Sequence, residues 1–200
     1  MIADSAARLR EAERAASLAL DRGCVEDLGI IERFLSGPLR DAELEMRDEM
    51  MSLGDEHSLL SHSLAAQAIN AVGERCWEKV FANVALRFRA RFSMYADALV
   101  EAEARFFADA GLSKAALGRR KPRRVTVPRV IAPDAPALSI ETGGRDSVVL
   151  GCVAQLERRL REAIAEEVEG ARARLIRRGR LNLARTRIAF RLTGAALKGR

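Results

Sequence analysis

The sequence predicts a mainly α protein: a helical bundle around one long amphipathic helix, then a basic proline-containing linker and a long C-terminal helix. Apolar residues recur every three or four positions over residues 58–110 and again over 149–175, which is the period of one helix face. Four of the five prolines fall within residues 118–145, where they prevent a continuous helix. At 200 residues and 48% hydrophobic content, the chain can bury a core without disulfides.

The first 53 residues predict three short helices rather than one. Ser5 or Asp4 can cap a first helix that ends at Gly23, because glycine adopts the backbone conformation that closes many helices. A second helix is expected over residues 26–35, ended by Ser36-Gly37-Pro38, and a third, acidic one over residues 40–53. Together with the long helix they form an expected N-terminal helical bundle, residues 1–117, that is acidic to neutral.

Residues 58–110 contain the strongest helical pattern in the chain. The stripe runs from Leu60 through Val80 and Phe88 to Phe106, and we expect a bend near Gly73. A helix of this length cannot bury its stripe alone. We therefore expect the preceding helices to fold back along it, or a second copy to form a homo-oligomer through the long helices, as in a coiled coil.

Residues 118–145 form the expected basic linker or arm, and residues 146–200 the C-terminal Arg-rich helical region. Prolines limit the linker to two brief extended pieces, 125–131 and 138–140. Asp146 is expected to cap the last helix and Gly179 to interrupt it. Beyond Gly179, one apolar stripe contains Leu181 and Ile188 and another contains Leu183, which predicts contacts on two sides.

Charge is distributed unevenly along the chain. Residues 1–117 contain 14 Lys and Arg against 20 Asp and Glu, whereas residues 118–200 contain 20 against 8. No carboxylate side chain follows Glu169, and ten basic residues lie after it. A block of this kind is typical of a segment that meets an anionic partner.

The sequence therefore predicts a non-catalytic scaffold or adaptor that binds a polyanion, with nucleic acid as the leading candidate. Few Asn, Gln or aromatic side chains lie in the two basic clusters, so we expect phosphate contacts and low sequence specificity. The predicted binding residues are Arg119, Arg120, Lys121, Arg123 and Arg124 in the linker, and Arg172, Arg174, Arg177, Arg178, Arg180, Arg185, Arg187 and Arg191 in the last helix.

Three other interpretations of the basic residues stay open. The arginines can be balanced by the acidic segment 40–53 of the same chain, or they can pair with that segment in a partner within an oligomeric assembly. An anionic membrane surface is the third, although the scattered angular placement of the arginines argues against a clean polar face.

Motifs for catalysis, metals and cofactors are weak, and we expect none of the three. His57 and His62 are five residues apart, which places them on different faces of a helix. A magnesium site would require Asp41, Glu45, Asp48 and Glu49 to converge with Glu166, Glu167 and Glu169. The three single cysteines, the absence of a long apolar stretch and the charged N-terminus predict a cytoplasmic protein.

Overall fold

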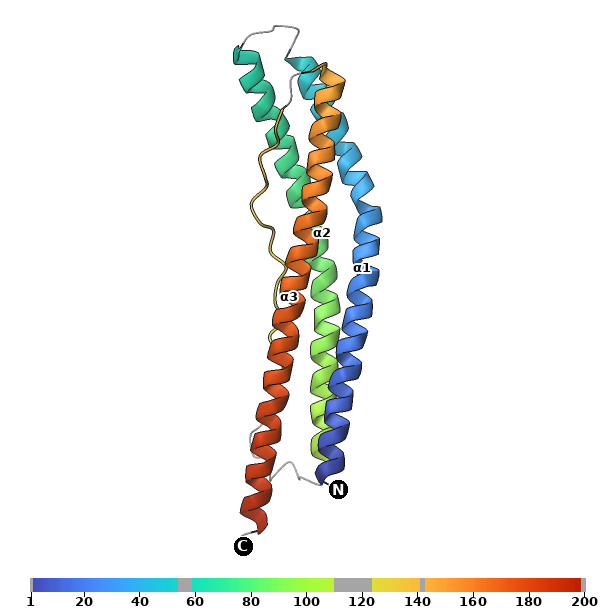
Figure 1. The fold of residues 1–200 in the computed structure, drawn as a ribbon, viewed down its shortest axis with the longest axis vertical. Coiled ribbons are helices and arrows are strands. Elements are labelled where there is room, and N and C mark those ends of the chain that lie inside the picture. The colour runs from blue at the N-terminus through green and yellow to red at the C-terminus, as the bar shows by residue number, and fades with distance from the viewer. Residues whose placement is uncertain (1, 54–58, 110–123, 141–142, 199–200) are drawn as a thin grey trace. The chain divides into compact units, whose positions relative to one another are not determined.

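Three long helices make up the computed structural model of the protein (Figure 1). They are α1 (Ile2–Ser52), α2 (Leu59–Asp109) and α3 (Arg145–Lys198). The structure describes residues 2–53, 59–109, 124–140 and 143–198, and the side chains within 5–53, 62–109, 124–140 and 143–188; these ranges contain no β-strand. The mainly α fold predicted from the sequence is thereby confirmed.

The chain divides into two compact units, and each helix contributes one stretch to each of them. The first unit comprises Met1–Val25, Phe88–Arg129 and Gly170–Arg200, and the second comprises Glu26–Arg87 and Val130–Glu169. Within both units α1 runs antiparallel to α2: Arg8 pairs with Asp109 in the first, and Asp41 pairs with Lys79 in the second.

The stripe predicted along residues 58–110 is the buried face of α2. Val80 and Val84 are buried in the second unit, and Phe88 and Phe92 are buried in the first. The other two helices complete each core, with Leu35 and Met46 of α1 and Leu156 and Leu160 of α3 in the second unit, and Leu9 and Leu20 of α1 and Leu175 and Leu183 of α3 in the first. Every helix therefore buries an apolar stripe of its own.

The prediction of three short N-terminal helices was wrong, because α1 continues through Gly23 and Pro38. Gly23 lies within the helix instead of ending it. A Cβ atom added there would contact the guanidinium of Arg91 on α2, which is the end of a flexible side chain.

Pro38 lies inside α1 although proline removes a backbone donor. The carbonyl of Phe34 therefore has no N–H partner at position 38, a change that costs a helix about 3 kcal/mol. Leu35 and Leu39 are buried on either side of the proline. Burial of such side chains contributes about 1.5–3 kcal/mol each, which is enough to offset the interruption.

The last helix also differs in detail from the prediction. It continues through Gly179, where an added Cβ would lie 2.7 Å from Cδ1 of Leu99 and 2.8 Å from the Tyr95 hydroxyl. It begins at Arg145, and the Val148 amide donates to the Gly144 carbonyl at 3.1 Å. Asp146 therefore lies in the first turn rather than at the cap, where it forms an ion pair with Arg47.

Residues 124–140 are extended but packed, not a free arm. In the second unit the Trp77 indole donates to the Pro133 carbonyl at 2.8 Å, and the Leu138 amide donates to Oδ1 of Asn70 at 2.7 Å. Val130 and Leu138 are buried. The described part of the predicted linker is therefore packed, because its apolar side chains and backbone groups find partners on the helices. The basic cluster at 119–123 lies outside the described residues.

Candidate polyanion-binding surface

The predicted basic residues differ in how much of them the structure describes. Arg119, Arg120, Lys121 and Arg123 lie outside the described residues, and Arg191 lies in α3 with a side chain that is not described. The remaining eight, Arg124, Arg172, Arg174, Arg177, Arg178, Arg180, Arg185 and Arg187, all belong to the first unit. Their partners within that unit separate them into two groups.

Three of the eight arginines form ion pairs. Arg172 pairs with Asp21 of α1, and Nε of Arg180 lies 3.0 Å from Oε1 of Glu13. Nη2 of Arg124 lies 3.0 Å from Oδ1 of Asp97 on α2. α1 and α2 therefore supply carboxylates that balance part of the basic block.

The acidic segment 40–53 has its own cations in the second unit. Oδ2 of Asp41 lies 2.9 Å from Nζ of Lys79, and this bond raises the pKa of the lysine. Glu45 pairs with Arg75, and Arg47 pairs with Glu43 within α1. The carboxylates that balance Arg172 and Arg180 are thus Asp21 and Glu13, which the sequence interpretation did not single out.

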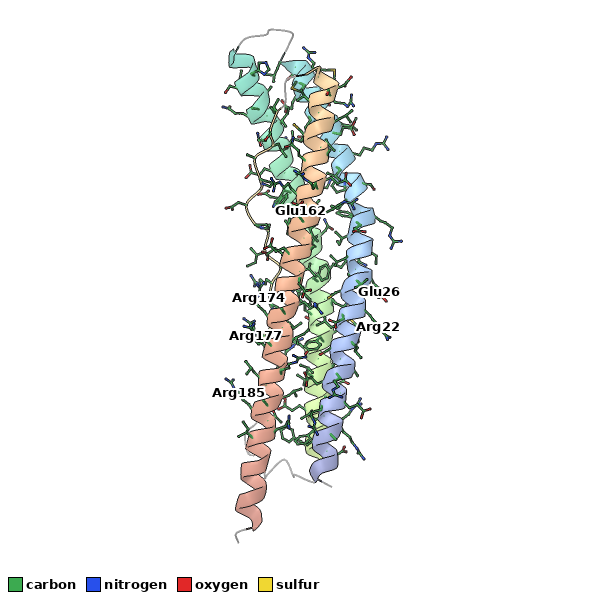
Figure 2. The ribbon with its side chains drawn as sticks, viewed as in Figure 1. Arg22, Glu26, Glu162, Arg174, Arg177 and Arg185 are labelled. Atoms are coloured by element: carbon green, nitrogen blue, oxygen red, sulfur yellow. The ribbon has the colours of Figure 1, made fainter. Side chains whose placement is uncertain are left out.

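The other five of the eight, Arg174, Arg177, Arg178, Arg185 and Arg187, have no carboxylate partner among the described side chains. Arg174, Arg177 and Arg185 are exposed, and Figure 2 shows all three projecting away from the helix on one side. Nη1 of Arg178 donates to the Thr126 carbonyl at 3.1 Å, a neutral partner that leaves its charge uncompensated. We call Arg174, Arg177, Arg178 and Arg185 the arginine face.

Helix geometry explains why these four residues share a surface. At about 100° per residue, Arg174, Arg178 and Arg185 fall within roughly 40° of one another, and Arg177 lies about 60° to one side. Arg180 lies about 60° beyond Arg177, toward α1. The arginines thus project in several directions, as expected, and two of the outlying ones, Arg172 and Arg180, form ion pairs with α1.

Residues 124–129 of the packed segment adjoin the arginine face within the first unit. Arg178 binds the Thr126 carbonyl, while Val125 and Pro128 are buried and Arg129 is exposed. Arg129 was missed in the sequence analysis because it lies outside both basic clusters. Its place on the packed segment brings one more cation to this part of the first unit.

Two large apolar side chains lie among the arginines. Leu181 is 53% exposed and Ile188 is 58% exposed, whereas Leu183 is buried. Of the described members of the two predicted stripes, Leu183 is therefore in the core, and Leu181 and Ile188 face solvent.

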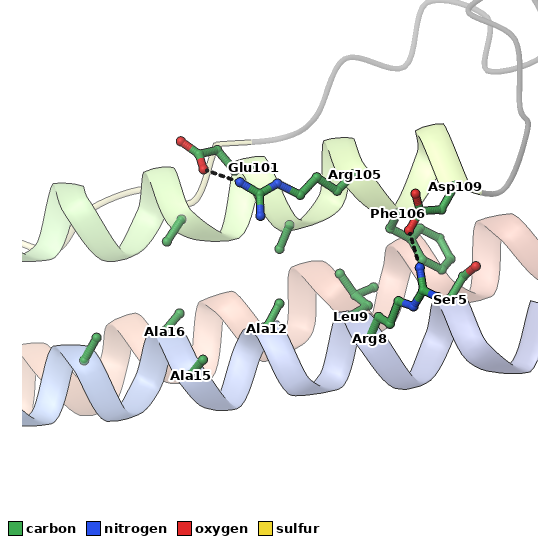
Figure 3. Close-up of a pocket in the computed structure, with 13 residues that line it drawn as sticks. Ser5, Arg8, Leu9, Ala12, Ala15, Ala16, Glu101, Arg105, Phe106 and Asp109 are labelled. Carbon is green, nitrogen blue, oxygen red and sulfur yellow. Dashed lines mark hydrogen bonds and ion pairs between the residues drawn. The ribbon is translucent and has the colours of Figure 1, made fainter.

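A groove lined largely by alanines lies between α1 and α2 of the first unit (Figure 3). Ala12, Ala15 and Ala16 face it from α1, together with Leu9, and Phe106 lies at one end. The Arg8–Asp109 and Arg105–Glu101 ion pairs cross or flank it. Its lining is made mainly of small apolar side chains, and its four ionisable side chains are engaged in these two ion pairs.

The described residues contain no constellation for metal or nucleophilic chemistry. No group of three or more His, Cys, Asp and Glu side chains that could hold a metal ion occurs in them. Burial raises the pKa of the Cys76 thiol to about 11, so it is protonated at neutral pH and a poor nucleophile. His62 is exposed, and His57 lies outside the described residues.

Comparison with known proteins gives no guide to the function, so a functional proposal has to rest on the residues of this chain. No family model, curated protein or solved structure matches the sequence. No stretch of the described helices combines the length and the hydropathy that a transmembrane span requires.

Proposed function

We propose that the protein is a non-catalytic helical scaffold that binds a polyanion through the arginine face. Nucleic acid is the leading candidate for this polyanion. The observation that carries this proposal is that Arg174, Arg177, Arg178 and Arg185 lie together on α3 without a described carboxylate partner. One guanidinium group can donate two parallel hydrogen bonds to two oxygens of the same phosphate. Four such groups along about 16 Å of helix can contact successive phosphates.

Low sequence specificity follows from the side chains around the arginine face. The exposed neighbours are Leu181, Ala184 and Ile188, which offer no hydrogen bonds to base edges. Recognition would thus depend on the phosphate backbone and on released counterions.

Nucleic-acid binding is tested by fluorescence anisotropy with labelled duplex DNA and single-stranded RNA at two NaCl concentrations. Replacing Arg174, Arg177 and Arg185 by Gln should weaken binding at least tenfold. It should also lower the slope of log affinity against log salt by about two to three for the duplex, because three phosphate contacts are lost.

A matched control removes the same charge elsewhere. Arg33, Arg89 and Arg158 are exposed and have no ion pair with a described residue, and their triple replacement by Gln should change affinity less than threefold. Absent binding, salt-independent binding, or an equal loss in both triple variants would overturn the proposal.

The exposure of Leu181 and Ile188 favours a second candidate function, a helical subunit of an assembly. Apolar side chains rimmed by arginines are typical of protein interfaces. Sedimentation should then show a concentration-dependent oligomer that Leu181→Gln with Ile188→Gln converts to monomer. Flotation with anionic vesicles distinguishes this from attachment to a lipid surface, because only the latter carries the protein to the top of the gradient.

A further inference from the structure

A second basic feature of the first unit lies between α1 and α3, outside the arginine face. It is a groove of about 360 Å³ whose apolar floor includes Leu9 and Leu183, both buried. Four arginines line it, two from each helix: Arg10, Arg14, Arg180 and Arg187. We call this feature the arginine groove.

One carboxylate faces these four cations. Glu13 lines the groove and binds Nε of Arg180 at 3.0 Å. Arg10, Arg14 and Arg187 have no ion pair with any described residue. The groove therefore holds an excess of three positive charges.

The four neighbouring guanidinium groups repel one another, and an anion bound in the groove would relieve this repulsion. Arg10 and Arg14 are four residues apart and Arg180 and Arg187 seven apart, so each pair lies on one helix face. Like charges four residues apart on a helix, such as Arg10 and Arg14, repel each other. The backbone brings the two pairs together across one groove, and an anion placed there would be attracted by both helices at once.

We propose that the arginine groove binds a compact oligophosphate, a group with two or more adjacent phosphates. One guanidinium group can donate two parallel hydrogen bonds to two oxygens of the same phosphate. Arginines on two facing helices therefore match a ligand that carries negative charge at both of its ends. The volume lies within the range of small-ligand sites. The apolar floor leaves room for the organic part of a phosphate ester, so both inorganic polyphosphate and a nucleotide share the recognised chemistry.

The site does not rest on the proposed nucleic-acid function, because it uses other residues and another ligand. The two sites predict opposite effects for two matched double variants. Replacing Arg10 and Arg187 by Gln removes two charges from the groove, and replacing Arg174 and Arg185 by Gln removes two charges from the arginine face.

Binding is measured by isothermal titration with inorganic tripolyphosphate, and the thermal midpoint is followed in parallel. We expect saturable binding that raises the Tm of the wild-type protein, because the ligand links α1 to α3. The Arg10→Gln, Arg187→Gln variant should lose at least tenfold in affinity. The Arg174→Gln, Arg185→Gln variant should bind as wild type, and circular dichroism checks that both remain helical.

A third variant tests the role of the carboxylate. Glu13→Gln removes the only described competitor for Arg180 and should tighten tripolyphosphate binding several-fold. A merely structural Glu13 would instead leave binding unchanged or weaken it. Titration with ATP distinguishes the sources: tighter binding than tripolyphosphate indicates a nucleotide, and equal binding indicates free oligophosphate.

Three outcomes would overturn the oligophosphate site. They are no binding at millimolar tripolyphosphate, an equal loss in the two double variants, and a Tm increase that sodium sulfate reproduces at the same ionic strength. Failure of nucleic-acid binding alone would leave the site intact, because that assay depends on Arg174, Arg177 and Arg185.

Discussion

Gly179 and Gly151 lie in the same helix but should respond oppositely to a methyl group. A Cβ at Gly179 would lie 2.7 Å from Leu99 and 2.8 Å from the Tyr95 hydroxyl, whereas a Cβ at Gly151 meets nothing within 4 Å. Replacing an exposed helical glycine by alanine stabilises by up to about 1 kcal/mol, but overpacking costs about 1–3 kcal/mol. We expect Gly151→Ala to raise the free energy of unfolding and Gly179→Ala to lower it by about 1 kcal/mol.

Urea denaturation of the two variants measures this difference. The slope against urea should be unchanged for both, so that midpoints report stability alone. Equal stabilisation by the two substitutions would mean that Leu99 and Tyr95 move aside without cost.

Cys76 makes stability depend on alkaline pH. Its thiol is buried and donates to the Pro38 carbonyl at 3.5 Å, and burial raises its pKa from 9.0 to about 11. The folded state thus favours the neutral thiol, and this contribution is fully present below pH 9 and lost as pH rises to about 11. Its size is on the order of 1–3 kcal/mol.

Comparison of wild type with Cys76→Ala isolates this effect. Burial also raises the pKa of Tyr95, so both proteins should lose stability between pH 8.5 and 10.5. The wild type should lose more, as measured by urea unfolding at the two pH values. Parallel losses would assign the alkaline instability to Tyr95 and other groups.

At the scale of elements, a side-chain amide of α3 should help to hold the extended segment 130–140, together with Trp77 and Asn70 of α2. Gln155 accepts a hydrogen bond from the Ser139 amide at 3.0 Å and donates one to the Ser139 carbonyl at 2.9 Å, as a neighbouring strand would. Gln155→Ala should therefore destabilise the protein by about 1–2 kcal/mol and accelerate hydrogen exchange at Ser139.

Gln155→Glu provides the matched comparison for this segment. A carboxylate still accepts from the Ser139 amide but repels its carbonyl, so exchange should be intermediate between wild type and Gln155→Ala. Exchange rates that are identical in all three proteins would show that Trp77 and Asn70 hold the segment without Gln155.

At the scale of the whole molecule, stability and polyanion binding should respond differently to salt. Most ion pairs among the described residues join exposed side chains, such as Arg8 with Asp109 and Lys79 with Asp41, and exposed pairs contribute about 0–1 kcal/mol each. Raising NaCl from 50 to 500 mM should therefore change the free energy of unfolding by less than about 1 kcal/mol. Binding through four phosphate contacts should weaken roughly a thousandfold over the same range.

Parallel unfolding and anisotropy titrations measure the two responses. A large loss of stability at high salt would indicate that ion pairs between helices contribute more than their exposure implies. Binding that survives 500 mM NaCl would contradict a mainly electrostatic interface.

The sequence by itself determined that residues 59–109 form one helix and that the last thirty residues carry unbalanced positive charge. Helical period and charge are local properties, and they can be read from neighbouring positions. Only the tertiary structure decided that Gly23, Pro38 and Gly179 lie inside helices. Local preferences of about 1–3 kcal/mol are outweighed when burial on another helix stabilises the continuous form.

The tertiary structure also decided which arginines remain available. Asp21 and Arg172 are 151 positions apart, and Glu13 and Arg180 are 167 apart, so no local pattern predicts that they meet. Arg10 and Arg14 were missed for the same reason, because their groove exists only where α1 packs beside α3. Composition sets how many charges a chain has, but packing between distant segments sets which of them find a partner.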